Sequence, residues 1–390
     1  GPGFTMNQPL PVSEANRLLQ QLFSGQAADI SQLPASSQAL LEEANRQRRA
    51  DRAAHMTPQL APYSLLGMQL AGLHQGNLLS AALYPELKQA ESDSLDWLKS
   101  LFDLPYAQFS HGGSYNNLQA LWQARDRDSH NRRTVYASQA CHYSIAKACR
   151  ILGLELQLIE TDDREQMLIN KLAKACTDRP PLAIVLTAGT PVSGGWDPLE
   201  KALELARKTG SWVHIDAAWG GALWTLETSS LRVVSGQVDS LGFDPHKALF
   251  QPRPCSVYFS RHDLSATQET AYLSDAPKDR LAGSHGAELF LPLWLNLQLL
   301  GEHWFADQTR QRLAQADLFA RQLSPLTDGF VVNNGNGIIC FSAPEGALHT
   351  LVAEGVLSCA RLNGRDVYRV VFTSSDTRAD ALIARLRPFL

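Results

Sequence analysis

Hydrophobic and polar positions change their spacing repeatedly along the chain from about residue 90 onward. Short apolar runs alternate with segments in which apolar positions recur at the spacing of an α-helix. The runs predict strands over 134–137, 183–187, 212–215 and 239–243. The helical spacing predicts helices over 94–102, 117–127, 144–152 and 198–209. Strands separated by helices in this order predict an α/β fold with a mostly parallel sheet and helices on both faces.

The two ends of the chain have different patterns. Residues 6 to about 60 are polar, and 36–55 has the spacing of an amphipathic, charged helix. After the central part, 288–323 is helical in pattern, and the remainder predicts strands over 330–332, 337–341 and 368–372 with helices over 345–353 and 378–386. We expect four parts: an expression remnant over 1–5, a helical arm over 6–60, a large domain over 61–285, and a long helix with a small α+β domain over 286–390.

Composition narrows the function classes. The chain has 390 residues, of which 44% are hydrophobic and 19% charged, and such values are typical of a well-packed enzyme rather than a disordered protein. The net charge of −4 gives no reason to expect a nucleic acid or an anionic membrane as partner. The most apolar helical stretch, 289–300, is too short to span a bilayer.

The N-terminal pattern and the cysteine content give expectations about cellular location and metal binding. No charged segment followed by an apolar one opens the chain, so we do not expect secretion. Six scattered cysteines without a Cys-x-x-Cys pair are typical of free thiols in a reducing compartment. We therefore expect a cytoplasmic protein without a metal site.

The strongest candidate chemistry lies in Asp244-Pro245-His246-Lys247, directly after a predicted strand. An earlier predicted strand ends at Asp216, and ligands of parallel sheets bind beyond the carboxyl ends of the strands. Pyridoxal phosphate forms an imine with a lysine and needs a carboxylate under its ring nitrogen. Lys247 and Asp216 are therefore candidates for this pair.

Three further loops fit the same cofactor, although each has an ordinary structural explanation. Gly112, Gly113 and Ser114 precede a predicted helix, whose N-terminus can bind a phosphate, but a simple glycine turn looks the same. His142 can stack on a conjugated ring or be a buried structural histidine. Thr190 follows a predicted strand, where it can line a cofactor pocket or belong to a plain loop.

The order of these motifs resembles the pyridoxal-phosphate-dependent group II amino-acid decarboxylases, which include glutamate, aromatic amino acid, cysteine sulfinate and diaminobutyrate decarboxylases. The resemblance runs from about Gly76 to Arg310. It implies the aspartate-aminotransferase-like fold, fold type I, with a mostly parallel seven-stranded sheet and a small C-terminal domain. It also implies a homodimer with active sites at the interface and an amino acid as substrate.

The resemblance assigns roles to the cofactor residues. Lys247 would carry the internal aldimine, Asp216 would pair with the pyridine nitrogen, and His142 would stack on the ring opposite Ala218. Thr190 would lie near the ring hydroxyl. The phosphate would be held by Gly112, Gly113, Ser114 and His246.

The resemblance is weaker for the residues that face the substrate. A loop tyrosine, for which Tyr272 is the candidate, would protonate the α-carbon, and Arg369 would contact the substrate carboxylate or form a structural ion pair. The chain has Ser-Tyr-Asn-Asn over 114–117 where Ser-Glu-Ala-Asn is usual, and 283–288 contains no arginine pair. Tyr115 and His285 are therefore candidates for an altered substrate pocket.

The predicted reaction is decarboxylation of an L-amino acid to its amine and carbon dioxide through a Lys247 Schiff base and a quinonoid intermediate. The same scaffold serves aminotransferases, aldolases, β-eliminating lyases and oxidative deaminases, and the sequence leaves these open along with the substrate. A non-catalytic binding protein is a third class, against which intact Lys247 and Asp216 argue. A dinucleotide site is excluded because no Gly-x-Gly-x-x-Gly opens an early strand–helix unit.

Overall fold

The computed structural model describes residues 34–47, 49–226, 229–264 and 280–390, together with Ser13, Arg17 and Gln20. The chain divides into two compact units, 1–49 and 50–390. The first contains α2 (Ala35–Arg46), which ends well before the predicted boundary at residue 55. The predicted helix does not extend to residue 55, because the backbone of Ala53 bonds to the C-terminal part of the chain instead of to a helix. Its N–H donates to the carbonyl of Val356, and its own carbonyl accepts from Val371.

A seven-stranded sheet forms the centre of the second unit, with strand order β1-β7-β6-β5-β4-β2-β3. Only β7 runs opposite to the other six strands, so the sheet is mostly parallel, as expected. The strands are β1 (Tyr106–Ser110), β2 (Thr134–Ser138), β3 (Glu155–Ile159), β4 (Ala183–Thr187), β5 (Trp212–Asp216), β6 (Ser240–Phe243) and β7 (Ser256–Ser260).

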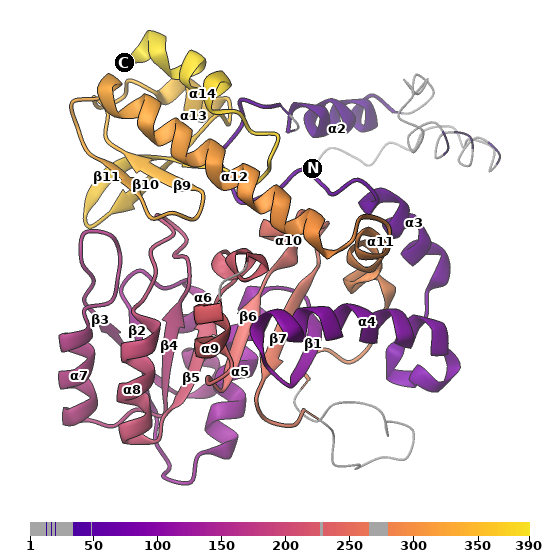
Figure 1. The fold of residues 1–390 in the computed structure, drawn as a ribbon, viewed down its shortest axis with the longest axis vertical. Helices are drawn as coiled ribbons and strands as arrows, with labels where there is room; N and C mark the ends of the chain where they lie inside the picture. Colours follow the sequence, from indigo (N-terminus) through magenta and orange to yellow (C-terminus); the bar gives the residue numbers. More distant parts are fainter. Residues whose placement is uncertain are drawn as a thin grey trace, which may run out of the picture. The chain divides into compact units, whose positions relative to one another are not determined.

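Both faces of this sheet are buried, which explains the uninterrupted apolar runs in the sequence. Along β4, Ala183 and Val185 pack with α5 and α6, whereas Ile184 and Leu186 pack with the cluster that includes α4, α7 and α8. The alternation is the two-residue period of a strand. Figure 1 shows α7 and α8 together along the end of the sheet formed by β2 and β3.

The helices of the second unit vary widely in length. The α-helices are α3 (Ser64–His74), α4 (Pro85–Phe102), α5 (Gly113–Arg127), α6 (Ser144–Leu152), α7 (Ile169–Asp178), α8 (Leu199–Thr209), α9 (Ser229–Ser235), α10 (Pro245–Ala248), α11 (Leu291–Leu300), α12 (Glu302–Leu323), α13 (His349–Ala353) and α14 (Ala379–Leu386). The 3₁₀ turns are η1 (Leu78–Leu83), η2 (Gly220–Thr225), η4 (Ala287–Leu289), η5 (Ser324–Leu326) and η6 (Arg387–Phe389). Among the described residues, none of these helices has both the length and the hydropathy of a membrane span.

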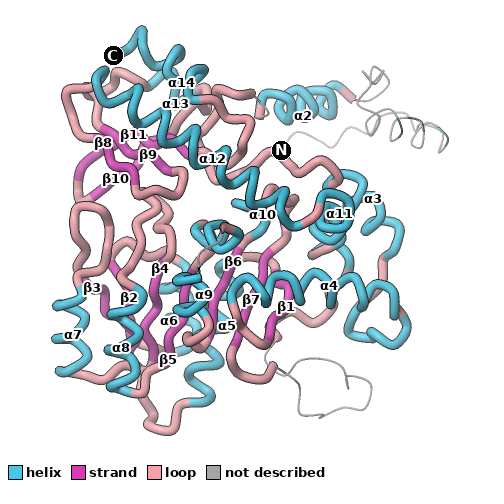
Figure 2. Tube along the Cα trace, viewed as in Figure 1, coloured by secondary structure: helices cyan, strands magenta, loops and turns pink. Residues whose placement is uncertain are grey.

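A second, antiparallel sheet lies in the C-terminal part, with strand order β10-β11-β9-β8. Figure 2 shows its strands as a group separate from the large sheet. Its core side chains pack against α12 and α14. The predicted long helical region is divided because Gly301 has a φ of +79°, which ends α11 and starts α12. The strands are β8 (Val331–Asn333), β9 (Ile338–Phe341), β10 (Ser358–Leu362) and β11 (Arg365–Val371).

Candidate active site

Six strands of the large sheet run in the same direction and end at the same edge, and five of them, all except β3, are followed by loops that meet there. These loops line a cavity of about 540 Å³. The register pairs Thr187, the last residue of β4, with Asp216, the last residue of β5. The cavity therefore lies where ligands of parallel sheets bind. The predicted site residues that line it are Gly112, Gly113, Ser114, Tyr115, His142, Asp216, Ala218, His246, Lys247 and Arg369.

Lys247 lies on the single turn of α10, which begins with Pro245 directly after β6. Its Nζ is 3.4 Å from Oδ2 of Asp244, and Nε2 of His246 is also 3.4 Å from that oxygen. The hydroxyl of Ser256 donates to Oδ1 of Asp244 at 2.5 Å. Burial would raise the pKa of Asp244, but the charge of Lys247, with His246 and Ser256, outweighs burial and lowers the pKa to about 2. At neutral pH an ionised carboxylate thus faces the lysine.

Asp216 ends β5 and is 6% exposed. Its Oδ1 accepts the backbone N–H of Ala218 at 3.1 Å, and its Oδ2 accepts from Nδ2 of Asn117 at 3.1 Å. Each oxygen has a second lone pair, so the carboxylate can accept one more donor from the cavity.

His142 lies before α6, and its ring has a defined tautomer. Its Nδ1 is 3.1 Å from the backbone nitrogen of Ser144 and 2.7 Å from the Ser144 hydroxyl. A backbone N–H can only donate, so Nδ1 accepts and the ring proton of neutral His142 is on Nε2. Burial lowers the pKa of His142, the charge of Lys247 lowers it further, and Asp216 opposes both. The imidazole is therefore neutral at neutral pH.

The glycine turn connects β1 to α5. The helix begins at Gly113, so the first N–H groups of α5 lack partners within the helix and lie beside the cavity. A methyl group on Gly113 would lie 3.2 Å from Oδ2 of Asp244 and 3.5 Å from Cβ of Ala218. The turn therefore keeps open a narrow space beside the helix N-terminus, where an anion binds favourably.

Thr190 does not line this cavity. It is fully buried, and its hydroxyl donates to Oε1 of Glu165 at 2.7 Å and accepts the backbone N–H of Gly195 at 2.8 Å. The cavity is lined instead by Thr187, whose buried hydroxyl has no hydrogen-bond partner among the described residues. Only the position of Thr187 at the end of a predicted strand could have indicated it from the sequence.

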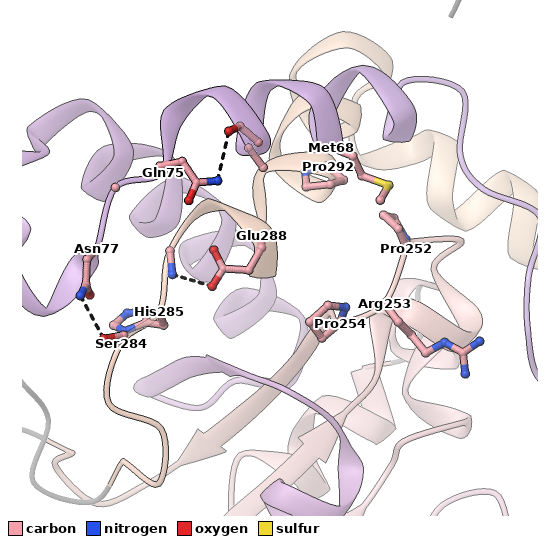
Figure 3. A pocket seen from close by; sticks show the side chains of 14 residues that line it. Met68, Gln75, Asn77, Pro252, Arg253, Pro254, Ser284, His285, Glu288 and Pro292 are labelled. Atoms are coloured by element: carbon pink, nitrogen blue, oxygen red, sulfur yellow. Dashed lines mark hydrogen bonds between the residues drawn. The ribbon is translucent and has the colours of Figure 1, made fainter. Parts of the chain in front are cut away.

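His285 lines a second cavity, of about 500 Å³, that Figure 3 shows together with Met68 of α3 and Glu288. Its Nε2 is 3.4 Å from the buried carboxylate of Glu91. Arg253 lines both cavities, so the two cavities are neighbours at this residue. Tyr272 lies outside the described residues.

Arg369 reaches the cavity from β11 of the smaller sheet. Its guanidinium donates to three backbone carbonyls, those of Pro191 at 2.6 Å, Val192 at 2.8 Å and Ala54 at 3.3 Å. Burial lowers its pKa, although the group stays charged. These bonds connect Arg369 to the loop after β4 and to Ala54, and none of the three involves a carboxylate.

The sequence matches a known protein family. The family model described as "Pyridoxal-dependent decarboxylase conserved domain" matches residues 15–344. The probable L-aspartate decarboxylase of Halobacterium salinarum is 27% identical over 278 residues, which are 70% of this chain and 78% of that protein.

Two solved structures are similar in fold. Catharanthus roseus tryptophan decarboxylase in complex with L-tryptophan has a TM-score of 0.79 and 19% identity, covering 100% of this chain and 90% of that one. Rhodiola rosea 4-hydroxyphenylacetaldehyde synthase has a TM-score of 0.80 and 18% identity, covering 98% of each chain. The fold is therefore that of the fold type I enzymes. Since the family model covers most of the sequence, the chain belongs to the pyridoxal-dependent decarboxylases and is a pyridoxal-phosphate-dependent amino-acid decarboxylase.

Proposed function

We propose that Lys247 binds pyridoxal phosphate covalently and that Asp216 holds its ring nitrogen. The residues around the cavity fit this cofactor in three respects. The amine and the carboxylate line one cavity, the N-terminus of α5 offers N–H groups for the phosphate, and the hydroxyl of Thr187 lacks a partner among the described residues. The last observation supports Thr187, rather than Thr190, as the threonine nearest the cofactor.

The bound cofactor supplies an electron-withdrawing ring that stabilises negative charge on the α-carbon of an amino acid. The protein must orient that ring and the substrate. In our proposal Asp216 keeps the ring nitrogen protonated, while neutral His142 and the methyl group of Ala218 cover its two faces. Gly112, Gly113, Ser114 and His246 hold the phosphate in this proposal, and the supporting observation is their position around the cavity beside α5.

The substrate contacts are also proposals. Tyr115 and Arg369 line the cavity and support a role near the substrate, whereas His285 lines the neighbouring cavity and receives no substrate contact in this proposal. We propose Tyr272 as the acid that protonates the α-carbon. Tyr272→Phe should lower the rate of amine formation and leave cofactor binding unchanged, and full activity would remove Tyr272 from the mechanism.

We further propose that the enzyme is a homodimer. Helix α3 supports this, since it is apolar on nearly all sides yet exposes much of its side-chain surface. Exposed apolar patches of this kind mark interaction sites. The exposed side chains are Leu65, Leu66, Met68, Leu70 and Leu73. A cytoplasmic location and the division into 61–285 and 286–390 remain proposals, to be tested by fractionation and limited proteolysis.

Product analysis tests the proposed function. The purified protein with added pyridoxal phosphate is incubated with acidic, aromatic and diamino L-amino acids in turn, and carbon dioxide and amine are measured. We expect equal amounts of both products from at least one substrate and neither product from Lys247→Ala. A keto acid or an aldehyde in place of the amine would indicate another reaction on the same scaffold. Unchanged activity of Lys247→Ala would overturn the site assignment.

A further inference from the structure

A buried chain of hydrogen bonds leads from the interior of the sheet to Asp216. Because an ionised carboxylate only accepts hydrogen bonds, the 3.1 Å contact with Asn117 requires the amide nitrogen of Asn117 to face it. The amide oxygen of Asn117 then faces Nε2 of His214 at 3.0 Å, and Nε2 must donate. The orientation of the amide is thus set by the charge of Asp216.

His214 continues this chain on β5. It is fully buried, and burial lowers its pKa to about 3, so the ring is neutral with its proton on Nε2. Its Nδ1 is 2.7 Å from the hydroxyl of Ser240 and accepts the hydroxyl proton. The Ser240 oxygen in turn accepts the indole N–H of Trp212 at 2.9 Å. Four successive donors therefore point toward Asp216, and hydrogen bonds aligned in this way strengthen one another.

Asn117 is also a branch point. The second hydrogen of its amide nitrogen is donated to the hydroxyl of Ser144 at 2.9 Å. That hydroxyl is 2.7 Å from Nδ1 of His142, to which it donates. Asn117 is 1% exposed, so all its polar atoms find partners inside the protein. Asn117 therefore bonds directly to Asp216 and, through the Ser144 hydroxyl, to His142.

We infer that Asn117, supported by His214 and Ser240, is a positioning residue that fixes Asp216 and His142 against the cofactor ring. The inference rests on the proposed function, since it requires both residues to contact the ring. Neither Asn117 nor His214 reacts in this scheme. They act by keeping the carboxylate and the imidazole at fixed positions, so their loss should affect the binding of the cofactor and the chemical step more than the binding of the amino acid.

The test uses Asn117→Ala and His214→Phe, with His214→Gln as the conservative variant that retains a donor for Asn117. Titration of the cofactor-free proteins with pyridoxal phosphate, followed by visible absorbance, gives the dissociation constant without reference to activity. We expect that constant to rise about tenfold in Asn117→Ala and His214→Phe, which is the scale of one lost hydrogen bond to a charged group. The kcat should fall by a similar factor or more while KM changes less than about twofold.

Gln123→Ala is the matched control, because Gln123 is a buried amide on the same helix that bonds to Tyr258 instead of the cavity residues. It should lose stability without weakening cofactor binding, and His214→Gln should retain most of the wild-type affinity. Equal cofactor affinity in wild type and Asn117→Ala would overturn the inference, as would an equal loss in Gln123→Ala. Failure of the proposed function is distinguishable, because it would leave Lys247→Ala with normal activity and absorbance.

Discussion

Replacing Asp244 by asparagine tests the electrostatics of the site quantitatively. The carboxylate is 1% exposed and lies 3.4 Å from both Lys247 Nζ and His246 Nε2. Its pKa falls from 3.8 to about 2, because the charge of Lys247, with His246 and Ser256, outweighs the opposing effect of burial. A pKa difference of this size corresponds to about 2 kcal/mol of folding free energy at neutral pH. Asp244→Asn should therefore destabilise the cofactor-free protein by about 2 kcal/mol.

The sign of the pH dependence follows from the lowered pKa. A carboxyl group with a lowered pKa stabilises the folded state above its unfolded value, and this stabilisation is lost as the pH falls toward the folded value. The penalty of Asp244→Asn should be constant between about pH 5 and about pH 8 and shrink as the pH falls from about 4 toward 2. Urea unfolding of both proteins measures this difference.

Asp307→Asn provides a control, since Asp307 forms an exposed ion pair with Arg310 and should contribute less than about 1 kcal/mol. The reasoning would be refuted if Asp244→Asn were as stable as the wild type at neutral pH. A penalty that grew between about pH 5 and about pH 8 would also refute it, because no carboxylate with a lowered pKa titrates there.

Three further changes test other parts of the site and the proposed interface. Asp216→Ala should lower kcat about a thousandfold or more while the fold is retained, because the ring nitrogen of the cofactor loses its partner. Near-normal turnover would contradict the proposed mechanism. Gly113→Ala should weaken cofactor binding about tenfold, because the added methyl group would narrow the space beside Asp244 and the helix N-terminus. Unchanged affinity in an absorbance titration would argue against phosphate binding there. The double variant Leu66→Asp and Leu73→Asp should be monomeric in light scattering if α3 forms the dimer interface, and an unchanged mass would exclude that interface.

The sequence predicted those strands in which the apolar pattern of the residues matches their burial in the structure. The run over 183–187 matches β4 at both ends, because a strand buried on both faces has no alternation of apolar and exposed polar positions. The strand β1 was not predicted, since Gln108 and Ser110 interrupt its apolar pattern. The edge strand β3 was missed because most of its residues are at least partly exposed and only Ile159 is buried.

The candidate site was predicted unevenly for a similar reason. Lys247 and Asp216 were recognisable because each follows an apolar strand within a distinctive motif. The contributions of Asn117 and Asp244 could not be predicted, because each has a partner on another element. Asn117 of α5 donates to Asp216 of β5, and Ser256 of β7 donates to Asp244. Thr187 ends β4 and Thr190 lies in the loop that follows, and only the folded structure distinguishes the threonine that lines the cavity from the one bonded to Glu165.

We propose Lys247 as the lysine that binds pyridoxal phosphate, and chemical trapping tests this directly. Reduction of the enzyme–cofactor complex with borohydride fixes the cofactor to its lysine, and peptide mapping by mass spectrometry then identifies that residue. We expect a single modified peptide that contains Lys247, and no modification after the amino-acid substrate has displaced the lysine. Modification at another lysine, such as Lys88 or Lys147, with Lys247 unmodified, would contradict the assignment of Lys247 as the cofactor-binding lysine.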